Sequence, residues 1–290
     1  MKKLFVLLTF FLAPLLFLSC QKELTLEQQY PEQNTQPGPG EIKVMTFNIR
    51  QNNDNDGAFN HWALRAGACR IMVEVQKPCL LGLQELSTTQ LEYMSLTLAE
   101  KGYVTVSEKE NLNSFMYNPD VLDMETTGMF YLNDTPEVNA TSWDGYMRYV
   151  AWAVMSVKAS GTRFFYMNTH LGLTALSRTK AMSLIVKRLK ILNTENLPVV
   201  FMADFNAMAT ESCFDVIRNS MVCTRDVAPI TDDIKTYNGW NNLEKNTPYI
   251  CDHIWISNTM ECSEYRTVTV PYEGHTYISD HFPVYSIIKF

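Results

Sequence analysis

The sequence lacks the common motifs of phosphate-binding and hydrolytic enzymes. It has no Gly-rich phosphate loop, no H-E-x-x-H and no G-x-S-x-G. The motifs that kinase-like, zincin and serine-hydrolase mechanisms require are therefore missing. Positive charge is also scarce, with 24 Lys and Arg against 31 Asp and Glu, a formal net charge of −7 and no basic cluster. This balance disfavours a tight, sequence-independent grip on a nucleic-acid backbone, although it does not exclude cutting one.

Cysteine spacings typical of metal or redox sites are absent as well, because no C-x-x-C occurs. Three cysteines (Cys69, Cys79 and Cys251) lie in apolar runs, where cysteine commonly behaves as a small buried hydrophobe. We therefore expect free thiols. Cys213 and Cys223 could pair only if the segment between them is not a straight helix, so their disulfide state stays open at this stage.

The N-terminus carries the only long apolar run that begins after positive charges. Lys2 and Lys3 precede an apolar run over residues 4–18, which predicts a signal peptide over residues 1–19. The small residue before Cys20 resembles a bacterial lipoprotein signal, which implies a lipid on Cys20 and an exported, membrane-anchored protein, periplasmic or at the cell surface. The alternative is plain cleavage and a soluble secreted protein.

The segment that follows is rich in Gln, Pro and Glu and has few apolar residues. We expect residues 20–40 to form the lipidated Cys and a flexible tether with a reach of roughly 25 Å. The folded domain then covers residues 41–290, a length that one sandwich with added helices can account for.

Polar side chains recur where strand-like apolar runs end. Six such runs are "EIKVMTFNIR", "CLLGLQEL", "RFFYMNTHLG", "VVFMADFN", "YICDHIWIS" and "TYISDHFPVYSIIKF", and they deliver Asn48, Glu85, Asn168, His170, Asp204, Asn206, Asp252, Asp280 and His281. Helix-period segments lie between several of them, at residues 64–75, 88–99, 177–192 and 212–219. Sheets and helices indicate a layered α/β protein whose strand ends gather at one rim.

The residue types at these ends suit phosphate chemistry. Carboxylate and amide oxygens are hard ligands that favour Mg²⁺ or Mn²⁺, and both ions keep waters and bind phosphate oxygens. A histidine beside an aspartate can act as an acid or a base, or can contact a developing phosphate charge. The pattern therefore predicts a divalent-metal phosphoester site.

Taken in order, the segments resemble the endonuclease/exonuclease/phosphatase superfamily, which includes the pancreatic-type deoxyribonucleases. The resemblance spans residues 42–288 and is carried by Thr46-Phe47-Asn48, Gln84-Glu85, Arg148, Asn168-Thr169-His170, Asp204-Phe205-Asn206, Asp252-His253 and Ser279-Asp280-His281-Phe282-Pro283. It implies a four-layer α/β sandwich, in which two mixed β-sheets pack face to face with helices on the outside.

The resemblance also implies a role for each matched residue. Glu85 would be the principal metal ligand with Asn48 and Asp280 adjacent, Asp204 would orient or deprotonate the attacking water, and Asn206 would steady the transition state. His281, oriented by Asp252, would contact the phosphate, while His170, Asn168 and Arg148 would bind it from the other side. The stretch "TYNGW", residues 236–240, resembles a supporting loop.

Two departures and one decoy need comment. Ala203 replaces the usual Gly before the Asp-x-Asn, and His253 replaces a frequent Tyr; because strand neighbours alternate faces, His253 points away from Asp252 and is expected to pack. "NNDNDG", residues 52–57, begins like a calcium loop, but its twelfth position is Ala63, so the bidentate Glu is missing. We expect a polar surface loop near the rim.

These features predict a Mg²⁺- or Mn²⁺-dependent phosphoester hydrolase, and we expect it to be a monomer. Its substrate, and any preference for monoesters or diesters, stay open: nucleic acid is the commonest family substrate, and an inositol or sugar phosphate or a lipid headgroup competes with it. A different class is a surface lipoprotein that binds a ligand without turnover. A third hypothesis is a di-zinc hydrolase that uses His170, His253 and His281.

Overall fold

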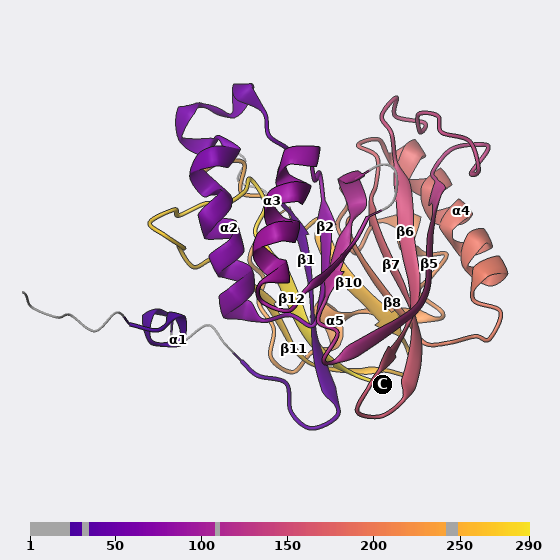
Figure 1. Cartoon of the computed structure of the whole chain (residues 1–290). Coiled ribbons are helices and arrows are strands. Elements are labelled where there is room, and N and C mark those ends of the chain that lie inside the picture. Colours follow the sequence, from indigo (N-terminus) through magenta and orange to yellow (C-terminus); the bar gives the residue numbers. More distant parts are fainter. Residues whose placement is uncertain (1–23, 31–34, 108–110, 242–248) are drawn as a thin grey trace, which may run out of the picture.

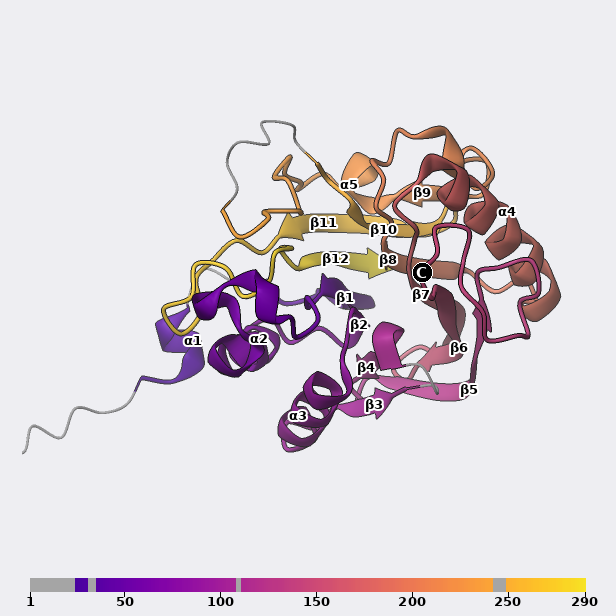
Figure 2. The same ribbon diagram turned by 90° about the horizontal axis from the view of Figure 1, so that it is seen from above.

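Two six-stranded mixed sheets pack face to face, and helices cover their outer faces (Figures 1 and 2). This computed structural model describes residues 24–30, 35–107, 111–241 and 249–290, so the expected signal peptide (1–19) and Cys20 lie outside the described residues. In the view from above, α2 and α3 lie on the outer side of one sheet and α4 on the outer side of the other. The expected four-layer α/β sandwich is confirmed.

The first sheet has the strand order β11-β12-β1-β2-β4-β3. Its strands are β1 (Glu41–Asn48), β2 (Leu80–Gln84), β3 (Val104–Val106), β4 (Phe115–Tyr117), β11 (Glu261–Thr267) and β12 (Val284–Lys289). The central pair, β1 and β2, is parallel and aligns Asn48 with Gln84. The carboxyl ends of both strands therefore meet at one edge.

The second sheet has the order β5-β6-β7-β8-β10-β9. Its strands are β5 (Leu122–Tyr131), β6 (Tyr149–Val157), β7 (Thr162–His170), β8 (Val199–Asp204), β9 (Met221–Cys223) and β10 (Asp252–Ser257). The parallel pair β7 and β8 aligns His170 with Asp204, and the antiparallel strand β10 places Asp252 opposite Asp204. Three of the expected site residues are thus neighbours in register.

The helices begin and end largely where their local signals are. They are α1 (Leu26–Gln29), α2 (Trp62–Gln76), α3 (Thr88–Ala99), α4 (Ala175–Leu192) and α5 (Thr224–Val227), with 3₁₀ turns η1 (Asp54–Asp56), η2 (Ala58–Asn60), η3 (Asn111–Asn113) and η4 (Ser212–Phe214). At the start of α3, the Gln90 side chain accepts a hydrogen bond from the Ser87 N–H at 3.0 Å. Helix α2 ends at Lys77, whose left-handed φ of 49° is followed by Pro78.

The expectation of a helix over residues 212–219 was wrong. Only the 3₁₀ turn η4 forms there, and the backbone continues with three-residue bonds such as Ile217 N–H to Phe214 O at 2.9 Å. Cys213, Phe214 and Ile217 of this segment are all buried in the core. Cys213 and Cys223 are buried free thiols, as are the other four cysteines of the described chain, which confirms the expectation for them.

Three apolar layers hold the sandwich together. Along β1, Val44 faces the layer between the two sheets, whereas its neighbour Met45 faces α2 and α3. Along β8, Val200 faces the central layer and Phe201 faces α4. Because alternate strand residues face opposite sides, β1 and β8 are buried on both faces, and β8 reads as a continuous apolar run.

The described part of the segment before the domain contacts the domain. Tyr30, just after α1, lies against Tyr272 with ring centroids 5.0 Å apart, and its hydroxyl accepts from the Glu273 N–H at 3.3 Å. Thr35 O accepts from the Lys43 ammonium at 3.4 Å. Across the part of the chain that the structure describes, every helix is too short or too polar to span a bilayer.

Candidate active site

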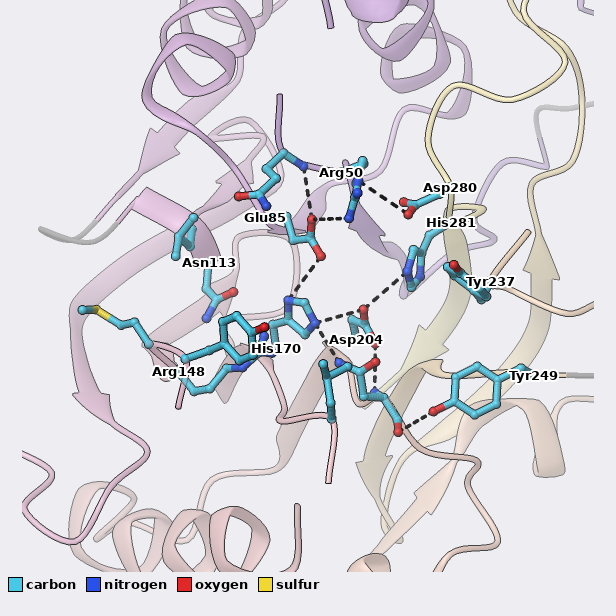
Figure 3. Close-up of a pocket in the computed structure, with 16 residues that line it drawn as sticks. Arg50, Glu85, Asn113, Arg148, His170, Asp204, Tyr237, Tyr249, Asp280 and His281 are labelled. Atoms are coloured by element: carbon cyan, nitrogen blue, oxygen red, sulfur yellow. Dashed lines mark hydrogen bonds and ion pairs between the residues drawn. The ribbon is translucent and has the colours of Figure 1, made fainter. Parts of the chain in front are cut away.

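A cavity of about 560 Å³ opens at the edge where the carboxyl ends of β1, β2, β7 and β8 meet. The side chains that line it come from both sheets and from the loops between them (Figure 3). They are Arg50, Gln51, Glu85, Leu112, Asn113, Tyr146, Met147, Arg148, His170, Leu173, Asp204, Asn206, Tyr237, Tyr249, Asp280 and His281.

The structure brings four of the expected residues, which are separated widely in sequence, into one chain of contacts (Figure 3). His170 Nδ1 lies 3.9 Å from Glu85 Oε1, and His170 Nε2 lies 3.3 Å from Asp204 Oδ2. On the other side of that carboxylate, His281 Nε2 lies 3.7 Å from the same oxygen. Two histidines therefore flank one aspartate, with a glutamate next to them.

Three residues of the cavity have a left-handed backbone, which is uncommon for residues other than glycine. The φ angles are 56° at Arg50, 60° at Glu85 and 49° at Asn206. Each of these residues comes one or two positions after a strand, where the chain turns out of the sheet. Such conformations cost of order 1–3 kcal/mol and persist where surrounding contacts enforce them, which occurs often at functional sites.

Asp204 is the most enclosed carboxylate of the cavity, at 1% exposure. It accepts hydrogen bonds from Asn48 Nδ2 and from the Asn206 N–H, both at 2.9 Å. Burial opposes its ionisation, but the nearby His281 ring and these two N–H groups lower its pKa overall. Asp204 is therefore ionised and can accept a proton or a hydrogen bond from water.

His281 is held as a cation by a second buried aspartate. Its Nδ1 lies 2.9 Å from Asp252 Oδ2, and Asp252 is fully buried. Burial alone would lower the pKa of His281, but Asp252 and Asp204 raise it well above its usual range. The imidazolium thus presents Nε2–H to the cavity while Nδ1 is fixed from behind, as the residue matching had implied for Asp252.

The loop at residues 236–240 holds this pair in place. The Thr236 hydroxyl accepts from the Asp252 N–H at 3.1 Å, and Asn238 Nδ2 donates to Ser279 O at 3.0 Å. The Tyr237 ring lies 5.1 Å from the His281 ring. The stretch "TYNGW" therefore packs on both halves of the histidine–aspartate pair.

His170 differs from His281 in its charge. Asn206 Nδ2 donates to Leu171 O at 2.9 Å, which fixes the amide orientation and places the same nitrogen 2.8 Å from His170 Nε2. Nε2 must then accept, so the ring proton is on Nδ1, toward Glu85. Burial lowers the pKa of His170, outweighing the nearby Asp204. A neutral and a charged histidine thus face one carboxylate.

Arg50 is a cavity residue that sequence reasoning missed. Its guanidinium donates twice to Asp56, at 2.8 and 2.7 Å, and lies 3.7 Å from Glu85 Oε2 and 3.6 Å from Asp280 Oδ2. The acidic loop at residues 52–57 therefore positions a cation, whereas the sequence suggested only a polar surface loop. The available signal was Arg50 itself, two residues after Asn48.

Three of the matched residues lie behind the cavity wall and do not line it. Asn168 donates to Leu83 O and Ser114 O, each at 3.0 Å, and accepts from Gln84 Nε2 at 2.7 Å. Both polar atoms of its side chain are engaged in joining the two sheets and Asn168 is fully buried, so the structure does not support the expected contact with substrate. Asp252 also lies behind, in its expected orienting role.

Asn48 is the third residue behind the wall, and its amide presents nitrogen to the site. Nδ2 donates to Asp204 Oδ2 at 2.9 Å and to Glu85 Oε1 at 3.2 Å, while Oδ1 accepts from the Arg50 N–H at 2.9 Å. The oxygen expected to bind a metal is therefore already engaged. Asn48 instead holds two carboxylates of the site together.

His253 lies apart from the other histidines, which excludes the di-zinc hypothesis in its original form. Its Nε2 lies 2.7 Å from Ile250 O, and its ring stacks on Phe205 with centroids 5.4 Å apart. The expectation that His253 packs is confirmed. Ala203, beside it in register, lies inside the extended strand β8, where a methyl group in place of Gly is accommodated.

Glu85 and Asp280 fit a hard divalent cation. Both carboxylates line the cavity, and the guanidinium of Arg50 already lies within ion-pair distance of both. Neighbouring His170 and His281 and the Asn48 amide lower the pKa of Glu85 against the opposing effect of burial, whereas burial raises the pKa of Asp280. Oxygen donors of this kind suit Mg²⁺ or Mn²⁺.

A second group of possible ligands is more tightly clustered but suits a metal less well. The ligand atoms of Asp204, Cys251, Asp252 and His281 lie within 4.8 Å of one another. Burial raises the pKa of the Cys251 thiol well above its usual range, so the thiolate form is disfavoured. The His281 Nδ1 that faces this group is already paired with Asp252.

Comparisons with solved structures show which proteins share this fold. A mannosyl-6-phosphatase of Bacteroides thetaiotaomicron is 25% identical to this chain, with a TM-score of 0.77. The match covers 86% of this chain and 100% of the phosphatase chain. An endonuclease/exonuclease/phosphatase family protein of the same species is also 25% identical, with a TM-score of 0.78, covering 88% and 99%. The chain has the fold of the endonuclease/exonuclease/phosphatase family and is similar to these members of it.

More distant members of this fold are also similar. The catalytic domain of human Nocturnin, solved with a bound sulfate anion, is 16% identical with a TM-score of 0.67, covering 88% of this chain and 96% of its own. That likeness concerns the fold alone. No family model and no curated protein sequence matches the chain.

Proposed function

We propose that the protein is a divalent-metal-dependent phosphoester hydrolase that directs an activated water at phosphorus. One observation carries the proposal: Glu85, His170, Asp204 and His281 converge on one cavity with complementary charges. An anion fits there, because a charged His281 and Arg50 line the same cavity as the ionised Asp204. Similarity to members of a phosphoesterase family supports the same reaction class.

Each residue has a role that follows from its contacts. Asp204, ionised and fixed by two N–H donors, orients the attacking water and accepts its proton. His281 donates Nε2–H to a phosphate oxygen, where negative charge grows as the bond to water forms. Asn206 donates a hydrogen bond to His170 Nε2, and the neutral His170 lines the cavity as a further hydrogen-bonding group.

Glu85 and Asp280 would hold Mg²⁺ or Mn²⁺, which supplies Lewis-acid stabilisation of phosphate oxygens when bound. Arg50 lies within ion-pair distance of both carboxylates, so its charge offsets their mutual repulsion. Asp56 fixes the Arg50 guanidinium through two hydrogen bonds.

A small phosphate ester is the favoured substrate. The net charge is −7 and the lining residues surround one confined space, which suits a compact ligand better than a long polyanion. The similar mannosyl-6-phosphatase acts on such an ester, and we extend this substrate class to the present chain. We further propose export and anchoring through a lipid on Cys20, which loss of radioactive palmitate incorporation in Cys20→Ala would support.

Hydrolysis of a substrate panel tests the proposal. The panel contains sugar and inositol phosphates, single- and double-stranded DNA, RNA and sphingomyelin, each with Mg²⁺, Mn²⁺ or a chelator. Glu85→Ala and His281→Ala should abolish metal-dependent release of product, while the matched surface variants Glu92→Ala and His61→Ala keep it. Full activity in both site variants would rule out the proposed mechanism.

A further inference from the structure

The far wall of the cavity, on the side of Asn113 and Arg148, has features that the hydrolytic residues do not explain. In Figure 3 these two side chains lie across the pocket from Asp280 and Tyr237. Leu112, Tyr146, Met147 and Leu173 complete this wall. The residues do not belong to the group that faces Asp204, so they are available to the organic part of an ester.

Asn113 presents a buried acceptor without a partner. Its Nδ2 donates to Tyr149 O at 2.8 Å, and its backbone N–H donates to the Tyr149 hydroxyl at 2.7 Å. Because a carbonyl needs a donor, this bond fixes the amide with its oxygen turned away from Tyr149. Asn113 is 2% exposed and lines the cavity, and Oδ1 finds no hydrogen-bond partner among the described residues. A buried acceptor of this kind calls for a donor from the ligand.

Arg148 supplies donors on the same wall, and its guanidinium is held by Asp144. Its Nε and Nη2 both lie 3.3 Å from Asp144 Oδ2, and the same oxygen accepts from the Leu173 N–H at 3.2 Å. Gly172 permits this close approach, since a Cβ there would lie 2.8 Å from Asp144 Oδ2. The wall is therefore preorganised by contacts between two loops.

Tyr146 adds an apolar face at the rim. Its ring lies 5.5 Å from the Arg148 guanidinium carbon, and the residue is 59% exposed although it lines the cavity. The face of an aromatic ring is electron-rich and attracts polarised C–H groups. An acceptor, a fixed donor and a ring face together match a group that carries hydroxyls on a carbon ring.

We propose that Asn113, Arg148 and Tyr146 form a subsite for the hydroxyl-bearing organic group of a small phosphate ester, of the polyol or sugar phosphate class. A substrate hydroxyl donates to Asn113 Oδ1, Arg148 donates to a substrate oxygen, and the carbon ring packs on Tyr146. The inference rests on the proposed hydrolase function and names its substrate class. Sites built to hydrogen-bond a hydroxyl discriminate strongly against analogues that lack it.

Steady-state kinetics with paired esters test the subsite. A hexose 6-phosphate is compared with cyclohexylmethyl phosphate, which has the same ring size and ester but no hydroxyls. The wild type should prefer the hexose ester in kcat/KM by about 100-fold. In Asn113→Leu this preference should fall by about tenfold, because KM for the hexose ester rises. The kcat/KM for cyclohexylmethyl phosphate should change by less than about threefold.

Tyr146→Ala gives a second, independent readout, because an exposed ring can be removed without disturbing the core. KM for the hexose ester should rise by about fivefold with kcat nearly unchanged, whereas Phe59→Ala, an exposed aromatic outside the cavity, changes neither. If Asn113→Leu does not fold, as judged by circular dichroism, Tyr146→Ala decides.

The outcomes separate the two proposals. An unchanged preference in folded Asn113→Leu overturns the subsite and leaves the hydrolase function standing. Failure to release product from every ester of the substrate panel, with either Mg²⁺ or Mn²⁺, overturns the proposed function, and the subsite with it.

Discussion

Replacement of Asp252 by asparagine tests how His281 acquires its charge. The side chain keeps its size, and its oxygen can still accept from His281 Nδ1, now 2.9 Å from Asp252 Oδ2. The negative charge is lost from a fully buried position. An opposite charge at this distance shifts a pKa by about 1–3 units, which is about 1.4–4 kcal/mol of stabilisation of the imidazolium. Asp204, whose Oδ2 lies 3.7 Å from His281 Nε2, still raises the pKa of His281 in this variant.

The expected result depends on pH. The pKa of wild-type His281 is raised, so the imidazolium persists through neutral pH and is lost only as pH rises through the folded value. In Asp252→Asn the pKa of His281 is lower, so the imidazolium is lost at a lower pH. We expect kcat to fall by about 100-fold at pH 8 and by less at pH 6, where protonation is partly restored. The exposed Asp226→Asn is the matched control.

The assay is kcat against pH between about 5.5 and 9 at saturating Mg²⁺, with chemical denaturation in parallel. The His281 charge stabilises the fold below its unfolded pKa of about 6.5, and this contribution disappears as pH rises through the folded pKa. The stability difference between wild type and Asp252→Asn should therefore narrow at high pH. A variant whose pH–rate profile superimposes on the wild type, at equal kcat, would refute the reasoning.

Three further predictions concern other parts of the site and core. Glu85→Gln should weaken Mn²⁺ binding at least tenfold by calorimetry; an unchanged affinity would place the metal elsewhere. Asn206→Ala should lower the melting temperature by several degrees and kcat by at least about tenfold, because alanine at φ 49° costs about 1–2 kcal/mol and His170 loses its donor; a wild-type melting temperature would count against this. Burial lowers the pKa of Lys43 to about 8. The unfolding free energy of the wild type relative to Lys43→Met should therefore rise by on the order of 3 kcal/mol between pH 8 and 10.5. A difference in unfolding free energy that does not change over this pH range, measured by chemical denaturation, would contradict this prediction.

Much of the layered fold could be predicted because its signals are local. Helix α3 spans Thr88–Ala99, the predicted range, because Ser87 and Gln90 mark its start and apolar residues recur at helical spacing. The bent segment after η4 could not be found this way. Its short apolar spacing is compatible with a helix, and only packing against the core selects three-residue hydrogen bonds.

For the site, the amino-acid order by itself determined which acids and histidines stand at strand ends. Apolar runs that stop at Asp204 or His170 predict a rim, and the order of the matched segments identifies the family. These signals concern one strand at a time. They specify the side of a strand on which a residue lies but not the partner it meets.

Only the tertiary structure decided which side chains contact one another. Asn168 and Asn113 are the same residue type near strand ends, yet the facing sheet engages both polar side-chain atoms of Asn168, whereas Asn113 Oδ1 has no hydrogen-bond partner among the described residues. Arg50 reaches Glu85 and Asp280 because a left-handed turn and Asp56 direct it there. Hydrogen bonds between distant segments form only when the two sheets pack, so no local pattern encodes them.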